Sequence, residues 1–222
     1  MNRLANSWLL LIAIIIFPFA FAIGYNIDYS LFGLQIQGEE FEHKEPIFGI
    51  AAGTVLLFGA LKATRRWMGL RIVAQKNKFI YSDIISADRK RRINLYGILE
   101  IIFLLLFAGY YATLSVYTVY VGLVYLIIAS EHIIHLSLGL AKNLYRIGLT
   151  KKALVAVDRE SRVIFFSALR KVSKHQQTLY FEYSNELVLH MPMNMIPDEE
   201  VFMKELRQVV NPNKVFFEGF EK

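Results

Sequence analysis

Four ionisable residues fall inside otherwise apolar stretches of the chain: Glu100, Glu131, His132 and His135. Ionisable side chains are costly inside a bilayer and usually face a partner, a cavity or an ion path. Glu131 and His135 are four residues apart and share one helix face, whereas His132 points about 100° away. A carboxylate and an imidazole at this spacing can move protons, bind a divalent metal together with Glu100, or simply hydrogen-bond across two helices.

The rest of the sequence limits this chemistry. The chain has no cysteine, which excludes disulfides, thiolate metal sites and a cysteine nucleophile. The run Glu-His-Ile-Ile-His at 131–135 is not the zinc-protease motif, in which the glutamate follows the first histidine. No glycine-rich phosphate loop, Ser-His-Asp order or pair of catalytic carboxylates occurs in the less apolar segments. The sequence therefore predicts no cofactor and no metal, and it favours a noncatalytic protein.

The elements that carry these residues are long apolar runs. Of the 222 residues, 55% are hydrophobic, and they collect in runs long enough to cross about 30 Å of hydrocarbon, which takes roughly 20 helical residues. We expect an α-helical polytopic membrane domain over residues 1–147, with four transmembrane helices at about 8–25, 47–67, 95–111 and 116–140. The first run also has the layout of a signal peptide, with Ala20-Phe21-Ala22 as a cleavage motif.

The charges of the connecting segments predict the orientation. Residues 26–46 are acidic, whereas the connection after the second span and the residues after the fourth are basic. Cytoplasmic loops carry the excess of lysine and arginine. We therefore expect a multi-pass protein of the cell (inner, cytoplasmic) membrane with both termini in the cytoplasm. Short apolar stretches at 79–81 and 84–85 within the basic connection predict either an interfacial helix or a strand added to the C-terminal domain.

Basic residues flank the second and third spans and account for much of the formal net charge of +6. The candidates for contact with anionic lipid headgroups are Arg65, Arg66, Arg89, Lys90, Arg91 and Arg92. A juxtamembrane cluster of this kind attracts anionic lipid, or it only fixes the topology. Because the cluster lies against the bilayer between two spans, we do not expect nucleic acid as a partner.

The hydropathy pattern changes near Gly148 from long apolar runs to short alternating ones, which predicts a separate domain at 148–222. Strands are expected at 153–157 and 163–166, followed by a hairpin around Ser184-Asn185. A helix is expected after Pro197, because Asp198, Glu199 and Glu200 would complement its dipole. The sequence therefore predicts a small α+β domain in which one helix covers an antiparallel sheet.

The segments 148–154 and 163–172, the hairpin, Pro192 and the acid-capped helix together resemble bacterial multi-pass membrane proteins with a PH-like C-terminal cytoplasmic domain. The resemblance covers roughly the last third of the chain. It implies an antiparallel sheet closed by one helix, and a role in docking a ligand.

Three functions follow from these patterns. The first is a noncatalytic membrane scaffold or sensor whose PH-like domain docks a membrane or cytoplasmic protein, or anionic lipid. The second is an ion- or proton-conducting protein that uses Glu100, Glu131 and His135, and the third is a membrane-embedded, metal-dependent enzyme. The lipid bilayer is the partner common to all three, and the sequence does not set the oligomeric state.

Overall fold

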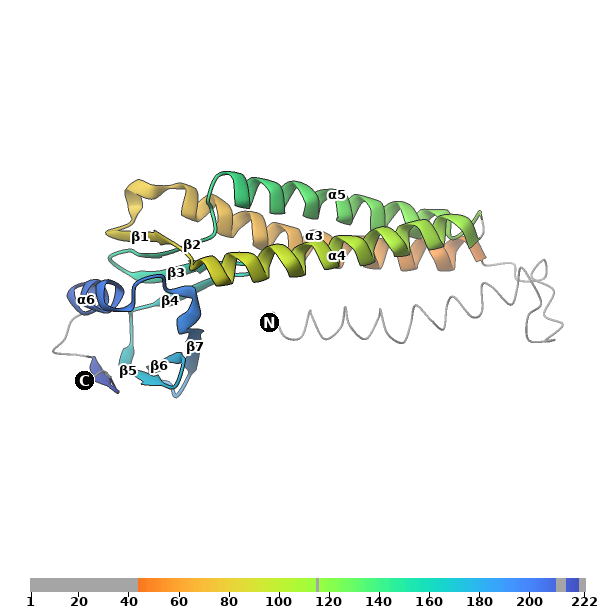
Figure 1. Cartoon of the computed structure of the whole chain (residues 1–222). Coiled ribbons are helices and arrows are strands. Elements are labelled where there is room, and N and C mark those ends of the chain that lie inside the picture. The colour runs from red at the N-terminus through yellow and green to blue at the C-terminus, as the bar shows by residue number, and fades with distance from the viewer. Residues whose placement is uncertain (1–43, 115, 211–214, 220–222) are drawn as a thin grey trace. The chain divides into compact units, whose positions relative to one another are not determined.

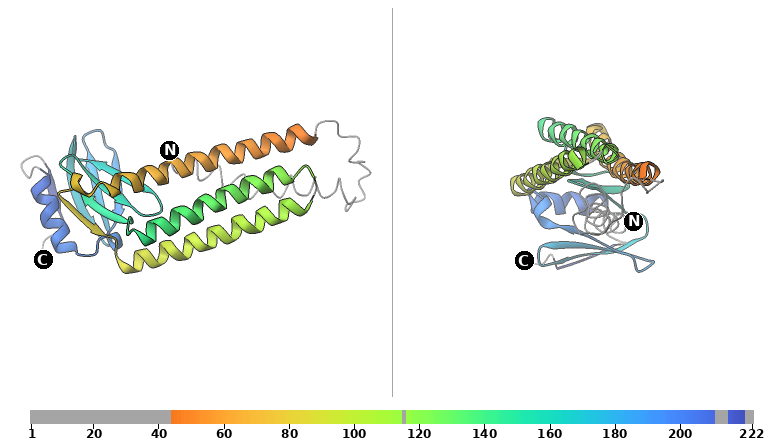
Figure 2. Two further views of the ribbon diagram at one scale, coloured as in Figure 1. Left: turned by 90° about the horizontal axis from the view of Figure 1, so that it is seen from above. Right: turned by 90° about the vertical axis from the view of Figure 1, so that its right-hand side faces the viewer.

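The computed structural model describes residues 44–114, 116–210 and 215–219. Helices α3 (Lys44–Ala74), α4 (Ala87–Leu114) and α5 (Val119–Ala141) lie side by side (Figures 1 and 2). All three are long and apolar enough to cross a membrane, which confirms the helices expected at 47–67, 95–111 and 116–140. The span expected at 8–25 lies outside the described residues.

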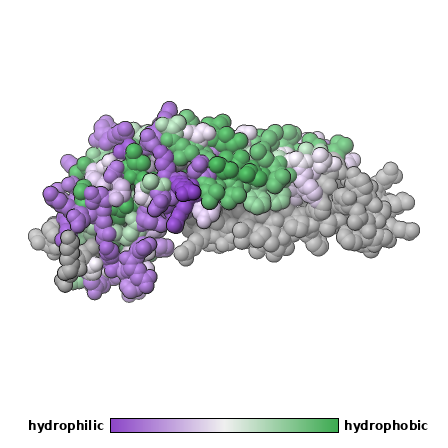
Figure 3. All heavy atoms as spheres, viewed as in Figure 1, coloured by the Kyte–Doolittle hydropathy of each residue, from purple (hydrophilic) through white to green (hydrophobic). Residues whose placement is uncertain are grey.

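The exposure of these helices calls for an apolar environment. Only 17% of the most apolar window of α3, and the same share of that of α4, is buried among the described residues. Hydrophobic side chains gather over the helices and hydrophilic ones over the sheets (Figure 3). An apolar surface of this extent is stable in lipid rather than in water.

Two helices extend beyond the predicted spans. α3 continues past Trp67 to Ala74, and α4 begins at Ala87, so that the run from Arg89 to Arg92 lies in its first turns. Hydropathy detects only the apolar part of a helix, whereas arginine and lysine are themselves good helix formers. The basic cluster is therefore helical and has a fixed geometry.

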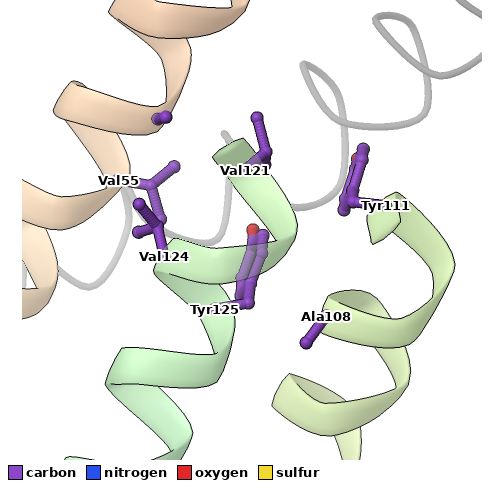
Figure 4. Packing of buried hydrophobic residues seen from close by; sticks show 7 residues of the cluster. Val55, Ala108, Tyr111, Val121, Val124 and Tyr125 are labelled. Carbon is purple, nitrogen blue, oxygen red and sulfur yellow. The ribbon is translucent and has the colours of Figure 1, made fainter. Parts of the chain in front are cut away.

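Contacts divide the described residues into two compact units: one contains those up to Ala63 and those in Leu99–Ile133, and the other contains Thr64–Ile98 and those from Ile134 onward. A hydrophobic cluster forms the core of the first unit (Figure 4); its members are Ala52, Val55, Ala108, Tyr111, Val121, Val124 and Tyr125. The rings of Tyr111 and Tyr125 stack with their centroids 6.0 Å apart. Close packing of aromatic and small side chains thus holds the three helices together here.

The turn between α4 and α5 is short, since α4 ends at Leu114 and α5 begins at Val119. The buried Thr118 hydroxyl donates a hydrogen bond to the carbonyl oxygen of Tyr111, 2.7 Å away. A Cβ atom at Gly122 would lie 2.8 Å from the carbonyl oxygen of Ala108, whereas one at Gly109 would meet nothing within 4 Å. Of these two glycines in the predicted spans, only Gly122 permits a close helix approach.

The second unit contains two four-stranded sheets. The first has the order β1-β2-β3-β4 and consists of β1 (Tyr81–Ile84), β2 (Arg146–Leu149), β3 (Ala153–Val157) and β4 (Ser161–Phe165). The second has the order β7-β6-β5-β8 and consists of β5 (Leu169–His175), β6 (Thr178–Tyr183), β7 (Val188–Pro192) and β8 (Phe216–Glu218). Every pairing is antiparallel except that of β5 with β8.

Strand β1 comes from the connection between α3 and α4, after a single 3-10 turn at Lys76–Lys78. It pairs with β2 in the register Tyr81 to Leu149 and Ile84 to Arg146. Of the two alternatives for this connection, the added strand is therefore correct. The connection between two apolar helices is built into the sheet of the C-terminal domain.

Helix α6 (Glu199–Val209) lies on the core of this domain and follows a 3-10 turn at Met193–Met195. As predicted, it begins after Pro197, and the Asp198 side chain caps it by accepting a hydrogen bond from the Val201 N–H, 3.1 Å away. Phe202 and Leu206 are fully buried, and the Phe202 ring contacts the ring of Tyr81 in β1 at a centroid distance of 6.1 Å. The helix thus seals the apolar interior of the sheets.

We expect Phe202→Ala to lower the free energy of unfolding by about 3–5 kcal/mol, because it leaves a cavity in a closed core. Val201→Ala is the matched control, since the Val201 side chain is 44% exposed on the same helix. Thermal unfolding of the purified protein in detergent measures both. Equal losses would show that α6 is not packed on the sheets.

Candidate functional site

A group of three ionisable residues, here called the helix triad, lies in the first unit and joins its three helices: Lys62 from α3, Glu100 from α4 and His132 from α5. The Lys62 ammonium lies 2.5 Å from the Glu100 carboxylate. The Nδ1 atom of His132 lies 3.5 Å from the same carboxylate oxygen, and the imidazole is buried. One glutamate therefore serves a cation and an imidazole at once.

The composition of the helix triad decides its chemistry. The Lys62 ammonium neutralises the carboxylate and donates a hydrogen bond to it, which lowers the cost of holding both groups among apolar helices. A divalent metal placed on Glu100 and His132 would face this ammonium and be repelled. Across residues 44–114, 116–210 and 215–219, no three histidine, aspartate or glutamate side chains gather as metal ligands. The geometry therefore favours hydrogen bonding between helices, rather than proton transfer or metal binding, as the role of Glu100.

The other two predicted residues of this group are Glu131 and His135, both on α5. Glu131 is half-buried and adjoins His132 in sequence. His135 belongs to the second unit, where it is buried and makes an edge-on contact with the Trp67 ring at a centroid distance of 5.6 Å. The ring of Tyr145 is 6.3 Å away on another side. His135 is thus packed among aromatic side chains.

A second charged cluster, here called the helix-end cluster, links α4 to the turn between β3 and β4. The Asp158 carboxylate is buried and lies 2.6 Å from the Arg89 guanidinium. Its other oxygen accepts the backbone N–H of Glu160 at 2.9 Å. A buried carboxylate is stable only when such partners surround it. The Arg89–Asp158 pair therefore fixes the start of α4 on the first sheet.

Arg66 and Tyr145 complete the helix-end cluster. Arg66 is buried at the end of α3, and Tyr145 is fully buried just before β2. Burial raises the pKa of Tyr145 to about 12, while the nearby Arg66 charge lowers it and Asp158 raises it. The phenol is therefore neutral at physiological pH. It lies close enough to Arg66 and Asp158 for both charges to affect it.

The six basic residues predicted to contact lipid divide into two groups. Arg91 and Arg92 are exposed, and Arg65 is half-buried. Arg66 is buried, Arg89 is paired with Asp158, and Lys90 donates a hydrogen bond to the Asn143 side chain at 2.8 Å. Further exposed cations, Arg71, Lys76 and Lys78, follow along the end of α3 and its connection. The exposed cations of α3, its connection and α4 are together called the exposed basic surface below; they are Arg71, Lys76, Lys78, Arg91 and Arg92.

Sequence reasoning missed three residues of these sites. Lys62 was counted only among the basic residues of the connection after the second span. It lies in an apolar helix, as Glu100 does, and this was the signal that could have identified it. Asp158 was not identified as a site residue, because nothing in the sequence indicates that it is buried. Tyr145 carried no signal at all.

Comparison of the chain with protein-family models, with curated proteins and with solved structures gave no match.

Loss of one charge from the helix triad is expected to destabilise the protein. Glu100→Gln leaves the Lys62 ammonium without its counter-charge, and Lys62→Met does the converse, so each should cost up to about 3 kcal/mol. The double variant Lys62→Met and Glu100→Gln carries neither charge and should unfold closer to the wild-type temperature. A double-mutant cycle of thermal unfolding in lipid nanodiscs measures the coupling, and additive losses would contradict it.

Asp158→Asn should lower the free energy of unfolding by about 3 kcal/mol, because the Arg89 guanidinium then lacks a buried anion. The control is Asp88→Asn, one residue before Arg89 and exposed to solvent. Its removal should cost about 0.3–1 kcal/mol through the helix dipole. Thermal unfolding followed by tryptophan fluorescence compares the two, and equal effects would show that the Asp158 pair is not coupled to the fold.

Proposed function

We propose that this protein is a noncatalytic membrane scaffold or sensor whose second unit, the sheets together with the ends of α3 and α4, binds anionic lipid headgroups. The observation that supports this most directly is the exposed basic surface at Arg71, Lys76, Lys78, Arg91 and Arg92. These residues lie at or just beyond the ends of helices that can cross a membrane. Each such charge near an anionic surface contributes about 1 kcal/mol of attraction.

The proposal includes a PH-like fold for the C-terminal domain. A four-stranded antiparallel sheet is followed by the strands β5, β6 and β7 and then by the single helix α6. This order supports the resemblance drawn from the sequence. The fold alone does not define a ligand, so the proposed ligand rests on the charge of the surface.

The sensing role rests on how the sheet domain receives its first strand. Within the second unit, β1 and the Arg89–Asp158 pair fix the first sheet to the end of α3 and the start of α4. Both helices continue without a break beyond this unit. A ligand that moves the sheet would therefore act on those helices through the backbone itself.

The proposed setting is a bacterial inner membrane, crossed four times, with both termini and the sheet domain in the cytoplasm. The basic connection between α3 and α4 supports this side for the sheet domain. Ion or proton conduction through Glu100 has weaker support, because Lys62 already neutralises that carboxylate.

Binding of anionic lipid is expected to depend on Arg91 and Arg92. Replacing both by Gln should remove about 2 kcal/mol of attraction, roughly a 30-fold loss of affinity. The gain in unfolding temperature between phosphatidylcholine nanodiscs and nanodiscs that also contain phosphatidylglycerol reports this binding. The variant should lose most of that gain, and added salt should reduce the gain for the wild type.

Lys151→Gln with Lys152→Gln is the matched control for this experiment. Both lysines are exposed, and they lie in the turn before β3 rather than at a helix end. This control should keep the full gain. If both double variants behaved alike, the attraction would come from net charge, and the proposed surface would be wrong.

A further inference from the structure

A shallow, open groove of about 500 Å³ lies within the sheet domain, away from the charged clusters described above. Most of its lining is apolar. The residues that matter here are Val163 and Phe165 of β4, Ala168 in the connection to β5, Tyr183 at the end of β6, and Leu187 and Leu189 around the start of β7. The groove thus opens where the last strand of one sheet meets the outer hairpin of the other.

The walls of the groove expose large apolar side chains. Phe165 is 56% exposed and Leu187 is 48% exposed. Ile164, which precedes Phe165 in β4, is only 3% exposed. A groove lined by exposed, large apolar side chains is typical of a binding site.

Strand β4 is the last strand of its sheet, and because the outward-facing Phe165 carbonyl already accepts the Tyr183 hydroxyl, the open part of its edge lies at Val163. The Phe166 N–H donates to the Lys152 carbonyl, and the register continues from Val163 opposite Val155 to Phe165 opposite Ala153. Backbone groups alternate in direction along an antiparallel pair. The N–H and C=O of Val163 therefore point away from β3, toward the open edge.

The groove is held open by the chain itself. Ala168 has a positive φ of 62°, which is a strained conformation for alanine. The Ser184 N–H and hydroxyl both donate to the Ala168 carbonyl at 2.9 Å, and the Tyr183 hydroxyl donates to the Phe165 carbonyl at 2.6 Å. Because these bonds tie the hairpin to the end of β4, the groove is formed before any ligand arrives.

Exposed cations lie in the segments that adjoin the groove-lining residues. Lys152 lies opposite Phe166 in the register of the first sheet, Lys151 precedes it, and Arg170 follows Ala168 by two positions, all with exposed side chains. Against these, Glu186 is the acidic residue of the hairpin turn. A ligand with acidic groups beside an apolar stretch complements these cations.

We propose that this groove binds an extended protein segment that adds to β4 as a further strand. Its backbone pairs with the free N–H and C=O of Val163, and its alternate apolar side chains enter the groove between Phe165 and Leu187. Acidic residues on either side of the apolar stretch meet the lysines and Arg170. An acyl chain would use the apolar walls but not the backbone edge, so a protein segment fits more of the site.

The test uses the full-length protein in detergent and a fluorescein-labelled synthetic peptide, Glu-Glu-Val-Thr-Val-Thr-Val-Glu-Glu, with fluorescence anisotropy as the readout. Leu187→Gln and Val188→Gln form a matched pair, because the two side chains are equally exposed at 48% and only Leu187 lines the groove. We expect Leu187→Gln to weaken binding about tenfold and Val188→Gln to leave it unchanged.

Val163→Pro is the second variant, since it removes an edge donor that the sheet does not use. It should weaken binding while the unfolding temperature stays near that of Leu187→Gln. A peptide with lysine in place of glutamate should bind more weakly than the acidic one.

Three results would overturn the proposal. They are no binding of the acidic peptide below about 1 mM, equal weakening by Leu187→Gln and Val188→Gln, and a change of oligomeric state in Leu187→Gln that assigns the groove to a second copy of the chain. The Arg91 and Arg92 variants should bind the peptide normally, so failure here is separate from failure of lipid binding.

Discussion

The pairing of β1 with β2 is the constraint on which the rest of this structure depends. A connection between two apolar helices would ordinarily be a free loop, but here its backbone supplies the edge of a four-stranded sheet. The neighbouring contacts follow from that pairing. The Ser86 hydroxyl donates to the Asn194 carbonyl at 2.5 Å, and Lys90 and Arg89 bind Asn143 and Asp158. The end of α3, the start of α4 and the sheet domain therefore form one compact unit.

This constraint changes what the basic residues can do. A cluster of arginines and lysines beside apolar helices would be expected to face lipid as a whole. The structure instead uses Arg66 and Arg89 inside the unit, where Asp158 and Tyr145 lie close to them, and leaves Arg91 and Arg92 exposed. Part of the positive charge serves folding and part is available to a ligand. A charge run in a sequence contains no information on that division.

The sequence predicted what depends on local pattern. The strand at 153–157 and the helix after Pro197 lie where alternation and capping residues indicated, and the three described apolar helices follow from hydropathy. Partners distant in sequence were not predictable. Strand β1 (Tyr81–Ile84) has a pairing partner that lies beyond two helices. Glu100 was grouped with Glu131, His132 and His135, but its ion pair with Lys62 was not predicted. Such choices depend on packing, which one sequence without relatives does not reveal.

The helix triad follows the same logic as the helix-end cluster. In each, one carboxylate serves two neighbours: Glu100 binds Lys62 and His132, and Asp158 binds Arg89 and the backbone N–H of Glu160. An ionised group removed from water is stable only when several partners share its charge, and each arrangement meets that condition with residues from different elements. Because such a group penalises any packing that separates it from its partners, the two carboxylates select one arrangement of elements that apolar contacts alone would specify less sharply.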